Sequence, residues 1–440
     1  MFDFTIEKIG IPEIISPIKL SKKDGDFIAN YVSDEDGVMF NIEKNMSDSQ
    51  MPRTSQWLEK AGPREKIFYN PAHVHAGIVT CGGLCPGIND VIRAIVMCLW
   101  HRYGIQNISG FRNGYRGFLD EFQLPVKSLN PDIVTDIQYK GGTILGSSRG
   151  SGEKTALIVD TLQKKGINIL FVIGGDGSQK GALAIAHEAM LRKAQIAVVG
   201  IPKTIDNDFS FIQKSFGFET AVSQAEVIVT HAHVEAHDAV NGISIVKVMG
   251  RESGFIAAHT TLAQNDVNFV LIPEIPFSLE GENGFFSHLY KRIEKRHHAL
   301  ILVAEGAGQD ILGQSEQFDA SGNIILKDIG IYLKDAIKKY FHSKGLEVTI
   351  RYIDPSYIIR SAPANTNDSL YCMRLGNNAV HAAMTGRTKL LVSLVNNHFV
   401  HIPINVATSK RNKVDPESSL WRDVIDTTGQ PPLMINSLVR

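Results

Sequence analysis

Two neighbouring segments combine glycine, carboxylate and lysine in a pattern that suits the transfer of a phosphoryl group. They are Gly174-Gly175-Asp176-Gly177-Ser178 and Pro202-Lys203-Thr204-Ile205-Asp206-Asn207-Asp208. Such a transfer needs backbone N–H groups that cradle phosphate, carboxylates that hold Mg²⁺, and a base that takes the proton of the accepting hydroxyl. The two segments contain all of these groups, so a kinase is the first hypothesis.

The first segment favours the phosphates of a nucleotide. Glycines let the backbone approach phosphate closely and direct N–H groups at it. Asp176 would then hold the Mg²⁺ that bridges those phosphates. A tight turn after a strand is the simpler alternative, but an apolar run before the segment and an amphipathic helical pattern after it favour the functional interpretation.

The second segment is the more informative one. If it is extended, Asp206 and Asp208 project to the same side. Two carboxylates on one side repel each other unless a cation or separate roles accommodate them. We therefore expect one to act as a base and the other as a metal ligand, with Lys203 neutralising the migrating group and Thr204 orienting it. An acidic turn without any chemistry is the alternative.

Further candidates follow later strands. Arg251, after Met249-Gly250, suits anion binding, although a surface arginine is a simple alternative. Arg351 and Arg360 lie on either side of Tyr357, and two guanidinium groups suit a sugar phosphate. Glu305, in a glycine-bearing loop, would accept hydrogen bonds from sugar hydroxyls or cap a helix. Spacing alone leaves both interpretations open for the later arginines and for Glu305.

The elements that must position these residues alternate between apolar strands and helices from about His75 onward. The runs 167–173, 195–200 and 243–248 each lead into one of the segments above. Continuous apolar strands between helices predict parallel sheets covered on both faces, and ligands bind beyond the carboxyl ends of such strands. We predict an α/β protein with two doubly wound, Rossmann-like domains, plus N- and C-terminal extensions.

Size and composition agree with this organisation. A chain of 440 residues suits two medium domains with extensions, and 43% hydrophobic and 21% charged residues are ordinary for a globular protein. A formal net charge of −1 gives no reason to expect nucleic acid or a membrane as partner. No apolar run approaches the ~20 residues of a membrane span. Four cysteines fit reduced thiols, and we expect a cytoplasmic protein, with an organelle as the alternative.

The motifs together resemble those of the phosphofructokinase family. GGLCPGIN, GGTILGSSR, GGDGS, PKTIDND, MGRESG, AEGAG and IDPSYIIR occur in the family's order, and the resemblance covers about residues 72–400. It implies transfer of a phosphoryl group to the 1-hydroxyl of fructose 6-phosphate, with Mg²⁺. It also implies an extension over 1–71, a nucleotide-binding domain over 72–217 plus 357–408, a sugar-phosphate domain over 218–356, and an extension over 409–440.

The resemblance also implies roles for single residues. Asp206 matches the base, while Asp176 and Asp208 match the partners of Mg²⁺. The nucleotide side comprises Gly82, Arg149, Gly150, Gly175, Asp176, Gly177 and Ser178. The sugar-phosphate side comprises Thr204, Ile205, Asp206, Met249, Gly250, Arg251, Glu305, Arg351, Tyr357 and Arg360. Lys203, Thr204 and Arg251 join Asp206 in catalysis. The arginine that matches Arg351 comes from a neighbouring subunit in this family, so a homo-oligomer is implied.

The departures from the short bacterial enzymes indicate the long branch of the family, which contains both ATP and pyrophosphate users. Lys203 replaces a glycine, Tyr357 replaces a histidine, and Gly242 stands where a second cross-subunit arginine would be. Pyrophosphate users carry aspartate at the position of Gly177, where it would collide with the α-phosphate of a nucleotide. Gly177 therefore favours ATP. Lys203 favours pyrophosphate more weakly, because a lysine assists without excluding.

Three other functions remain as alternatives. A pyrophosphate-dependent phosphofructokinase is the nearest, and a non-catalytic regulatory paralogue is opposed by the intact Asp176, Asp206 and Asp208. An NAD-linked oxidoreductase lacks its glycine fingerprint here. The sequence does not predict effectors, although allosteric control is known for the short enzymes, and it leaves dimer or tetramer open.

Overall fold

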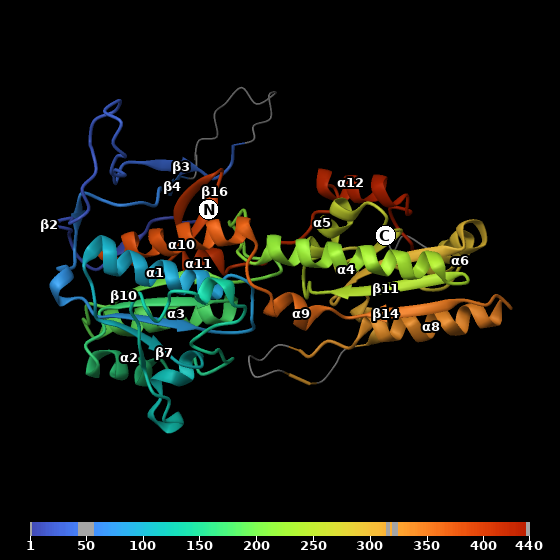
Figure 1. Cartoon of the computed structure of the whole chain (residues 1–440), viewed down its shortest axis with the longest axis horizontal. Coiled ribbons are helices and arrows are strands. Elements are labelled where there is room, and N and C mark those ends of the chain that lie inside the picture. Colours follow the sequence, from blue (N-terminus) through green and yellow to red (C-terminus); the bar gives the residue numbers. More distant parts are fainter. Residues whose placement is uncertain (1, 43–56, 314–316, 319–323, 437–440) are drawn as a thin grey trace. The chain divides into compact units, whose positions relative to one another are not determined.

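The computed structural model describes residues 2–42, 57–313, 317–318 and 324–436, and the chain divides into two compact units (Figure 1). The first unit comprises Met1–Thr204, Phe209–Gly217 and Ser361–Lys410. The second comprises Ile205–Asp208, Phe218–Arg360 and Arg411–Arg440. The chain therefore passes between the units inside the aspartate-rich segment itself.

The first unit is built on a seven-stranded sheet. Its order is β17-β16-β10-β9-β6-β7-β8, in which β8 and β17 pair antiparallel at the two edges and the others pair parallel. The strands are β6 (Ala76–Thr80), β7 (Ile108–Phe111), β8 (Lys127–Ser128), β9 (Ile169–Gly174), β10 (Ala197–Pro202), β16 (Leu390–Val395) and β17 (His398–Pro403). Every residue of β6, β9 and β10 is buried, which explains their continuous apolar sequences.

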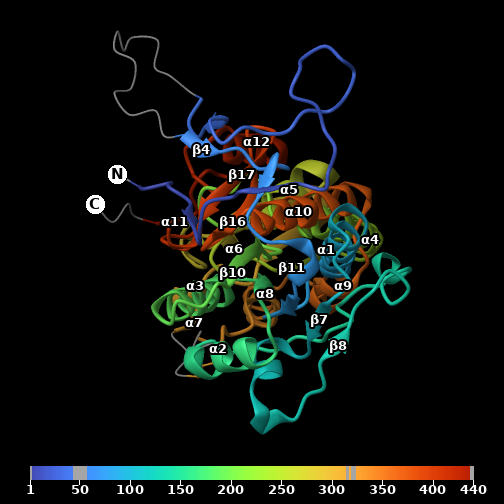
Figure 2. The ribbon, with the colours of Figure 1, turned by 90° about the vertical axis from the view of Figure 1, so that its left-hand side faces the viewer.

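Helices cover both faces of this sheet (Figures 1 and 2). One face carries α1 (Ile88–Tyr103) and α10 (Thr366–Met384), and the other carries α2 (Thr155–Lys164) and α3 (Asp176–Leu191), with the short α11 (Ile404–Ala407) beside α3. Gly376 lets α1 and α10 approach closely, because a Cβ there would lie 2.6 Å from the Cβ of Ala94. Single turns of 3₁₀ helix are η1 (Pro71–His73), η2 (Gly114–Phe118), η3 (Asp120–Phe122) and η4 (Ile137–Tyr139).

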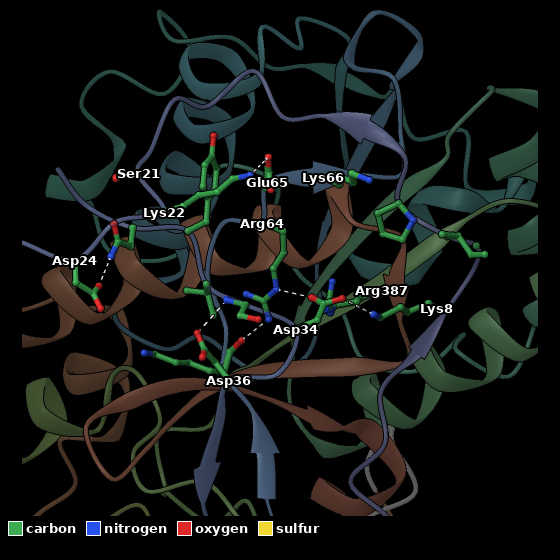
Figure 3. Close-up of a pocket in the computed structure, with 18 residues that line it drawn as sticks. Lys8, Ser21, Lys22, Asp24, Asp34, Asp36, Arg64, Glu65, Lys66 and Arg387 are labelled. Atoms are coloured by element: carbon green, nitrogen blue, oxygen red, sulfur yellow. Dashed lines mark hydrogen bonds and ion pairs between the residues drawn. The ribbon is translucent and has the colours of Figure 1, made fainter. Parts of the chain in front are cut away.

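The N-terminal extension packs on the first unit through short antiparallel pairs. They join β1 (Glu7–Lys8) to β15 (Arg387–Thr388), β2 (Ile14–Ile15) to β5 (Lys66–Ile67), and β3 (Gly37–Met39) to β4 (Trp57–Glu59). A charged pocket of about 1100 Å³ lies among these segments (Figure 3). Arg64 and Arg387 lie in it, and both hydrogen bond to Asp34, at 2.8 and 2.7 Å.

The second unit has a four-stranded, fully parallel sheet of order β12-β13-β11-β14. The strands are β11 (Gly242–Val248), β12 (Phe269–Leu271), β13 (His298–Ala304) and β14 (Thr349–Ile353). One face carries α4 (Phe218–Asp238), α5 (Phe255–Gln264) and α12 (Ser419–Thr428), and the other carries α6 (Phe285–Arg296) and α8 (Ile329–Ser343) (Figure 1). The short helices are α7 (Gln309–Leu312) and α9 (Ser356–Ser361).

The α/β fold with two helix-flanked, parallel-type sheets confirms the prediction from the sequence. Cys81, Cys85, Cys98 and Cys372 are all buried and form no disulfide. None of the helices in the described residues combines the length and the apolar character that a membrane span requires.

Candidate active site

Three loops of the first unit lie side by side because they follow the neighbouring parallel strands β6, β9 and β10. The backbone N–H of Lys203 donates to the carbonyl of Gly174 at 3.0 Å. A Cβ placed on Gly82 would lie 3.5 Å from the Lys203 Nζ and 4.0 Å from the Ser178 Oγ. Gly82 also has a φ of +87°, which favours glycine. The structure thus brings Gly82, Ser178 and Lys203 together, as predicted.

Gly174 and Gly177, two of the glycines near Asp176, have different reasons to be glycine. A Cβ on Gly174 would come within 2.4 Å of the Ser178 Cβ, so packing of the protein requires a glycine there. A Cβ on Gly177 would meet no atom within 4 Å. Gly177 lies in the first turn of α3, where glycine costs about 1 kcal/mol relative to alanine. No contact among the described residues requires a glycine at this position, which supports the interpretation that Gly177 leaves space for a ligand.

Asp176 is the first residue of α3, so its carboxylate lies at the end of the helix where the N–H groups are not used within the helix. Its side chain is 14% exposed and forms an ion pair with Lys180 at 2.9 Å. Mg²⁺ in kinases is commonly held by one or two carboxylates, substrate phosphates and waters. Within the ranges that the structure describes, no three His, Cys, Asp or Glu side chains gather as a metal site of their own. Asp176 therefore fits a Mg²⁺ that arrives with phosphate.

The loop that holds Arg149 and Gly150 is attached to the Gly82 loop. The N–H of Gly82 donates to the carbonyl of Ser148 at 2.9 Å, and the Ser147 hydroxyl donates to the carbonyl of Gly82 at 2.6 Å. Gly150 has a φ of +80°. Both residues predicted from the motif therefore lie on a loop fixed to the phosphate-side glycines.

Two residues that sequence reasoning missed hold the glycine loop in place. Gln179 is fully buried, and its Nε2 lies 3.0 to 3.1 Å from the carbonyls of Val172, Gly174 and Ile201. It therefore ties the start of α3 to the ends of β9 and β10. The Tyr115 hydroxyl donates to the carbonyl of Ser178 at 2.6 Å. A glutamine on a buried helix face was a detectable signal, whereas nothing in the sequence marked the tyrosine.

Asp206 belongs to the second unit, and its carboxylate is set against the Met-Gly-Arg loop. Oδ2 accepts from the backbone N–H of Arg251 at 3.4 Å, the backbone carbonyl accepts from the Ser253 hydroxyl at 3.1 Å, and Oδ1 is buried. Burial, together with the charges of Asp208 and Glu305, raises the pKa of Asp206 to about 7, and the charge of Arg360 opposes this rise. A carboxylate with a pKa near neutrality is suited to general base catalysis.

Asp208 departs from the sequence prediction in two ways. The segment is not extended, because Asn207 adopts a φ of +56°, a left-handed conformation that asparagine tolerates better than most residues. Asp208 is buried, and its Oδ2 accepts from the Arg411 Nη1 at 2.8 Å. Sequence reasoning missed Arg411, which lies in the segment 409–440 that the sequence analysis assigned to a C-terminal extension. Because the Asp208 carboxylate pairs with Arg411, the role of Asp208 as a Mg²⁺ ligand stays a prediction.

The loops after β11 and β13 close on each other. The N–H of Glu305 donates to the carbonyl of Val248 at 2.9 Å, and that of Gly306 to the carbonyl of Gly250 at 3.0 Å. A Cβ on Gly306 would lie 2.0 Å from the carbonyl oxygen of Arg251, so only glycine permits this approach. The parallel pairing thus places Glu305 beside the Met-Gly-Arg loop, in which Met249 is fully buried and Gly250 has a φ of +125°.

The arginines predicted for the sugar phosphate are only partly brought together. The Arg360 Nη2 lies 3.8 Å from the Glu305 Oε1, and Arg360 lowers the pKa of Asp206, so these three residues share one site. The Arg251 guanidinium donates to the carbonyl of Ile324. Arg351, on β14, pairs with Glu235 at 3.6 Å and is 57% exposed. No contact that the structure shows among the described residues joins it to Asp206.

Tyr357, Thr204 and Ile205 were also predicted to contact the sugar phosphate. Tyr357, on α9, is 85% exposed. The carbonyl of Thr204 accepts from the Ser215 hydroxyl at 2.7 Å, and Ile205 is buried. The predicted roles of these three residues toward the sugar phosphate remain predictions.

The model of the family described as phosphofructokinase matches residues 75–383. The chain belongs to the phosphofructokinase family. The chain is 55% identical over 442 residues to the ATP-dependent 6-phosphofructokinase of Borreliella burgdorferi, a match that covers 99% of this chain and 98% of that relative. It is 46% identical over 373 residues to the ATP-dependent 6-phosphofructokinase of Trypanosoma cruzi, covering 84% of this chain and 76% of the relative.

Solved structures of other phosphofructokinases share the fold. The pyrophosphate-dependent phosphofructokinase of Marinobacter aquaeolei matches with a TM-score of 0.66 at 21% identity, over 83% of this chain and 92% of that one. The phosphofructokinase of Pichia pastoris matches with a TM-score of 0.63 at 22% identity, over 81% of this chain and 37% of that one. At these identities the likeness concerns the fold alone.

Proposed function

We propose that this phosphofructokinase transfers the terminal phosphoryl group of ATP directly to the 1-hydroxyl of fructose 6-phosphate, producing fructose 1,6-bisphosphate in glycolysis. The observation that carries the donor is Gly177, where the structure leaves space that the protein's own packing does not need. Full-length similarity to a relative named as ATP-dependent supports the same donor.

On the first unit, the glycine loops bind the phosphates of ATP. The N–H groups at the start of α3 point toward developing negative charge, and Lys203 beside Gly82 adds a cation. Asp176 would hold Mg²⁺, which would supply positive charge to offset the negative charge of the phosphates. Gln179 and Tyr115 keep the loop that carries these groups in one conformation.

On the second unit, Asp206 accepts the proton of the 1-hydroxyl. As the sugar oxygen forms its bond to the phosphorus of the terminal phosphoryl group, the bond from that phosphorus to the bridging oxygen of ADP breaks, and the proton moves to the Asp206 carboxylate. Glu305 accepts hydrogen bonds from sugar hydroxyls, and the cations Arg251 and Arg360 bind the sugar phosphate. No covalent intermediate is needed, because positioning and charge stabilisation suffice for this reaction.

The exposed Arg351 supports a second part of the proposal. We infer that it serves the sugar-phosphate site of a neighbouring subunit in a homo-oligomer, and that the enzyme works in the cytoplasm. Sedimentation velocity, combined with activity at the same protein concentration, tests the assembly. A monomer with full activity would exclude this role for Arg351.

The test of the donor is a pair of assays on the purified protein, with ATP and with pyrophosphate, for the wild type and three variants. Gly177→Asp should abolish most use of ATP, because the new carboxylate occupies the space of the nucleotide's α-phosphate and repels it. Gly177→Asn has the same size without the charge, and Gly177→Ala adds only a Cβ to open space. Undiminished ATP turnover in Gly177→Asp would refute the donor argument. If the wild type used pyrophosphate but not ATP, the protein would be a pyrophosphate-dependent phosphofructokinase. If it used neither donor, the protein would be a regulatory paralogue.

A further inference from the structure

Lys247 is the charged residue of the buried strand β11, two residues before Met249. Its side chain is only 11% exposed. We propose that Lys247 is a positioning residue for the sugar-phosphate side of the site: it holds Asp354, and through it the start of α9, which carries Tyr357 and Arg360. This inference rests on the proposed function, because it assigns Lys247 to the substrate side of that reaction.

The contacts of Lys247 form a small, well-defined network. Its Nζ donates to the Asp328 Oδ2 at 2.6 Å and lies 3.0 Å from the Asp354 Oδ2. The Tyr352 hydroxyl lies 2.9 and 3.0 Å from the two carboxylate oxygens of Asp328. Asp328 also caps α8, since its Oδ1 accepts from the N–H of Ile331 at 3.0 Å. One ammonium group therefore joins β11, the start of α8 and the end of β14.

Packing alone does not explain a lysine at this position. Residues alternate between the two faces of a strand, so Lys247 lies on the same face of β11 as Ile243 and Ile245, which pack in the apolar core beneath α6 and α8. A buried ammonium is costly unless it is paired and hydrogen bonded, whereas an aliphatic residue would continue this core. The two aspartates that face Lys247 are therefore the reason for its charge.

Asp354 connects Lys247 to α9. While its Oδ2 faces the ammonium, its Oδ1 accepts from the backbone N–H of Ser356 at 3.1 Å and from the Ser356 hydroxyl at 2.5 Å. Ser356 is the first residue of α9. Asp354 thus fixes the first turn of a helix that is only six residues long, and a change at its charged end is transmitted to the whole helix.

The far end of α9 is part of the site. Arg360 lies 3.8 Å from Glu305 and lowers the pKa of Asp206. A displacement of α9 would therefore weaken binding of the sugar phosphate and also change the protonation of the proposed base. The loops that bind ATP belong to the first unit and share none of these contacts.

The experiment compares the steady-state constants of Lys247→Met with those of the wild type. We expect the KM for fructose 6-phosphate to rise about 10- to 100-fold while the KM for ATP stays within about twofold, because misplacement by an ångström costs factors of this size. Lys247→Arg keeps the charge and should restore most of the affinity. Asp354→Asn keeps the bonds to Ser356 but loses the charge, and should reproduce the effect in part.

Two controls separate positioning from general loosening. Phe341→Leu lowers stability at the opposite end of α8 without touching either aspartate, and Lys338→Met removes an exposed lysine from the same helix. The inference is overturned if Lys247→Met and Asp354→Asn both keep the wild-type KM for fructose 6-phosphate. It is also overturned if Phe341→Leu, at equal loss of thermal stability, raises that KM as much. Both outcomes leave the proposed function intact, whereas a wild type without phosphofructokinase activity would refute the proposed function and this inference together.

Discussion

Each unit contains a partly buried carboxylate among charged neighbours, and the pKa values of the two carboxylates are shifted in opposite directions. In the first unit, Glu59 accepts from the Arg387 Nε at 2.5 Å and lies 2.8 Å from the His401 Nδ1. In the second, Asp206 has the carboxylates of Asp208 and Glu305 near it. Burial raises the pKa of both groups. For Glu59 the hydrogen bonds and charges of His401 and Arg387 outweigh burial and lower the pKa to about 2, whereas the pKa of Asp206 rises to about 7.

The difference shows what each carboxylate contributes. Since the folded pKa of Glu59 lies below its unfolded value, its charge stabilises the fold above about pH 4.5, and this contribution is lost as the pH falls toward 2. The folded pKa of Asp206 lies above its unfolded value, so the folded state binds the extra proton and stability falls as the pH rises from about 4 to 7. Glu59 therefore attaches the N-terminal extension to the sheet of the first unit. Asp206 keeps a high pKa at a cost in the free energy of unfolding.

The largest expected effect is that of Asp206→Asn, which separates catalysis from stability. Asp206→Asn should lower turnover by roughly 10²–10⁴-fold, the usual contribution of a general base, and should raise the free energy of unfolding at pH 8 by about 1–3 kcal/mol, since no buried charge remains. Steady-state kinetics and urea unfolding of the same preparation measure both. Unchanged turnover would remove Asp206 from the role of base, and a large loss of stability would contradict the comparison with Glu59.

Glu59→Gln should give the opposite result. Removal of the carboxylate leaves the buried Arg387 with only the half-exposed Asp34 as charge partner, and breaking a buried pair typically costs about 3–5 kcal/mol. We expect that loss in urea unfolding at pH 7, with turnover of the folded enzyme within about threefold of the wild type. Glu65→Gln is the matched control, because Glu65 forms an exposed ion pair with Lys22 and should cost less than about 1 kcal/mol. Equal losses in the free energy of unfolding would show that Glu59 stabilises the fold no more than an exposed ion pair does.

The neighbours of Asp206 should tune its protonation in opposite directions. Glu305→Gln removes a charge that raises the pKa of Asp206, and Arg360→Met removes one that lowers it. Because the base works deprotonated, the acid limb of kcat/KM should move to lower pH in the first variant and to higher pH in the second, by about one pH unit each. Glu235→Gln removes the carboxylate that pairs with Arg351 and should leave the acid limb of kcat/KM unchanged. Shifts of the same sign in the first two variants would argue against this electrostatic account.

The smallest effect concerns Asp34, which shares Arg387 with Glu59 but is half-exposed. Burial raises the pKa of Asp34, but Lys8, Arg387 and Arg64 outweigh it and lower the pKa. Solvent screens these pairs, so Asp34→Asn should cost only about 1 kcal/mol in the free energy of unfolding. Differential scanning calorimetry at pH 7 would measure the loss. A cost as large as that of Glu59→Gln would mean that exposure does not separate the two carboxylates.

Much of the fold and the site could be predicted because it depends on local patterns. Continuous apolar runs between helical segments identified β9 and β10 of the first sheet and β11 of the second, and parallel strands place the loops after their carboxyl ends at one edge. The groups of Gly82 with Ser178 and Lys203, and of Asp206 with Arg251 and Glu305, follow from that geometry. The glycines of the motifs were informative for the same reason, because a position that tolerates no Cβ is one where the local backbone or a ligand approaches closely.

Other features depend on which distant segments meet. Arg411 neutralises Asp208 from 203 positions along the chain, and Glu59 meets Arg387 across 328. No periodicity or motif carries such pairings, because they arise only when separately folded segments pack together. The bend at Asn207 and the pKa of Asp206 belong to the same class.

The sequence by itself therefore determined the α/β class, the glycine- and carboxylate-bearing loops at the strand ends and the favoured donor, because strand periodicity and backbone sterics act over a few residues. Only the tertiary structure decided which carboxylate remains basic and which is neutralised, because burial and charge act through space between residues that the chain keeps far apart.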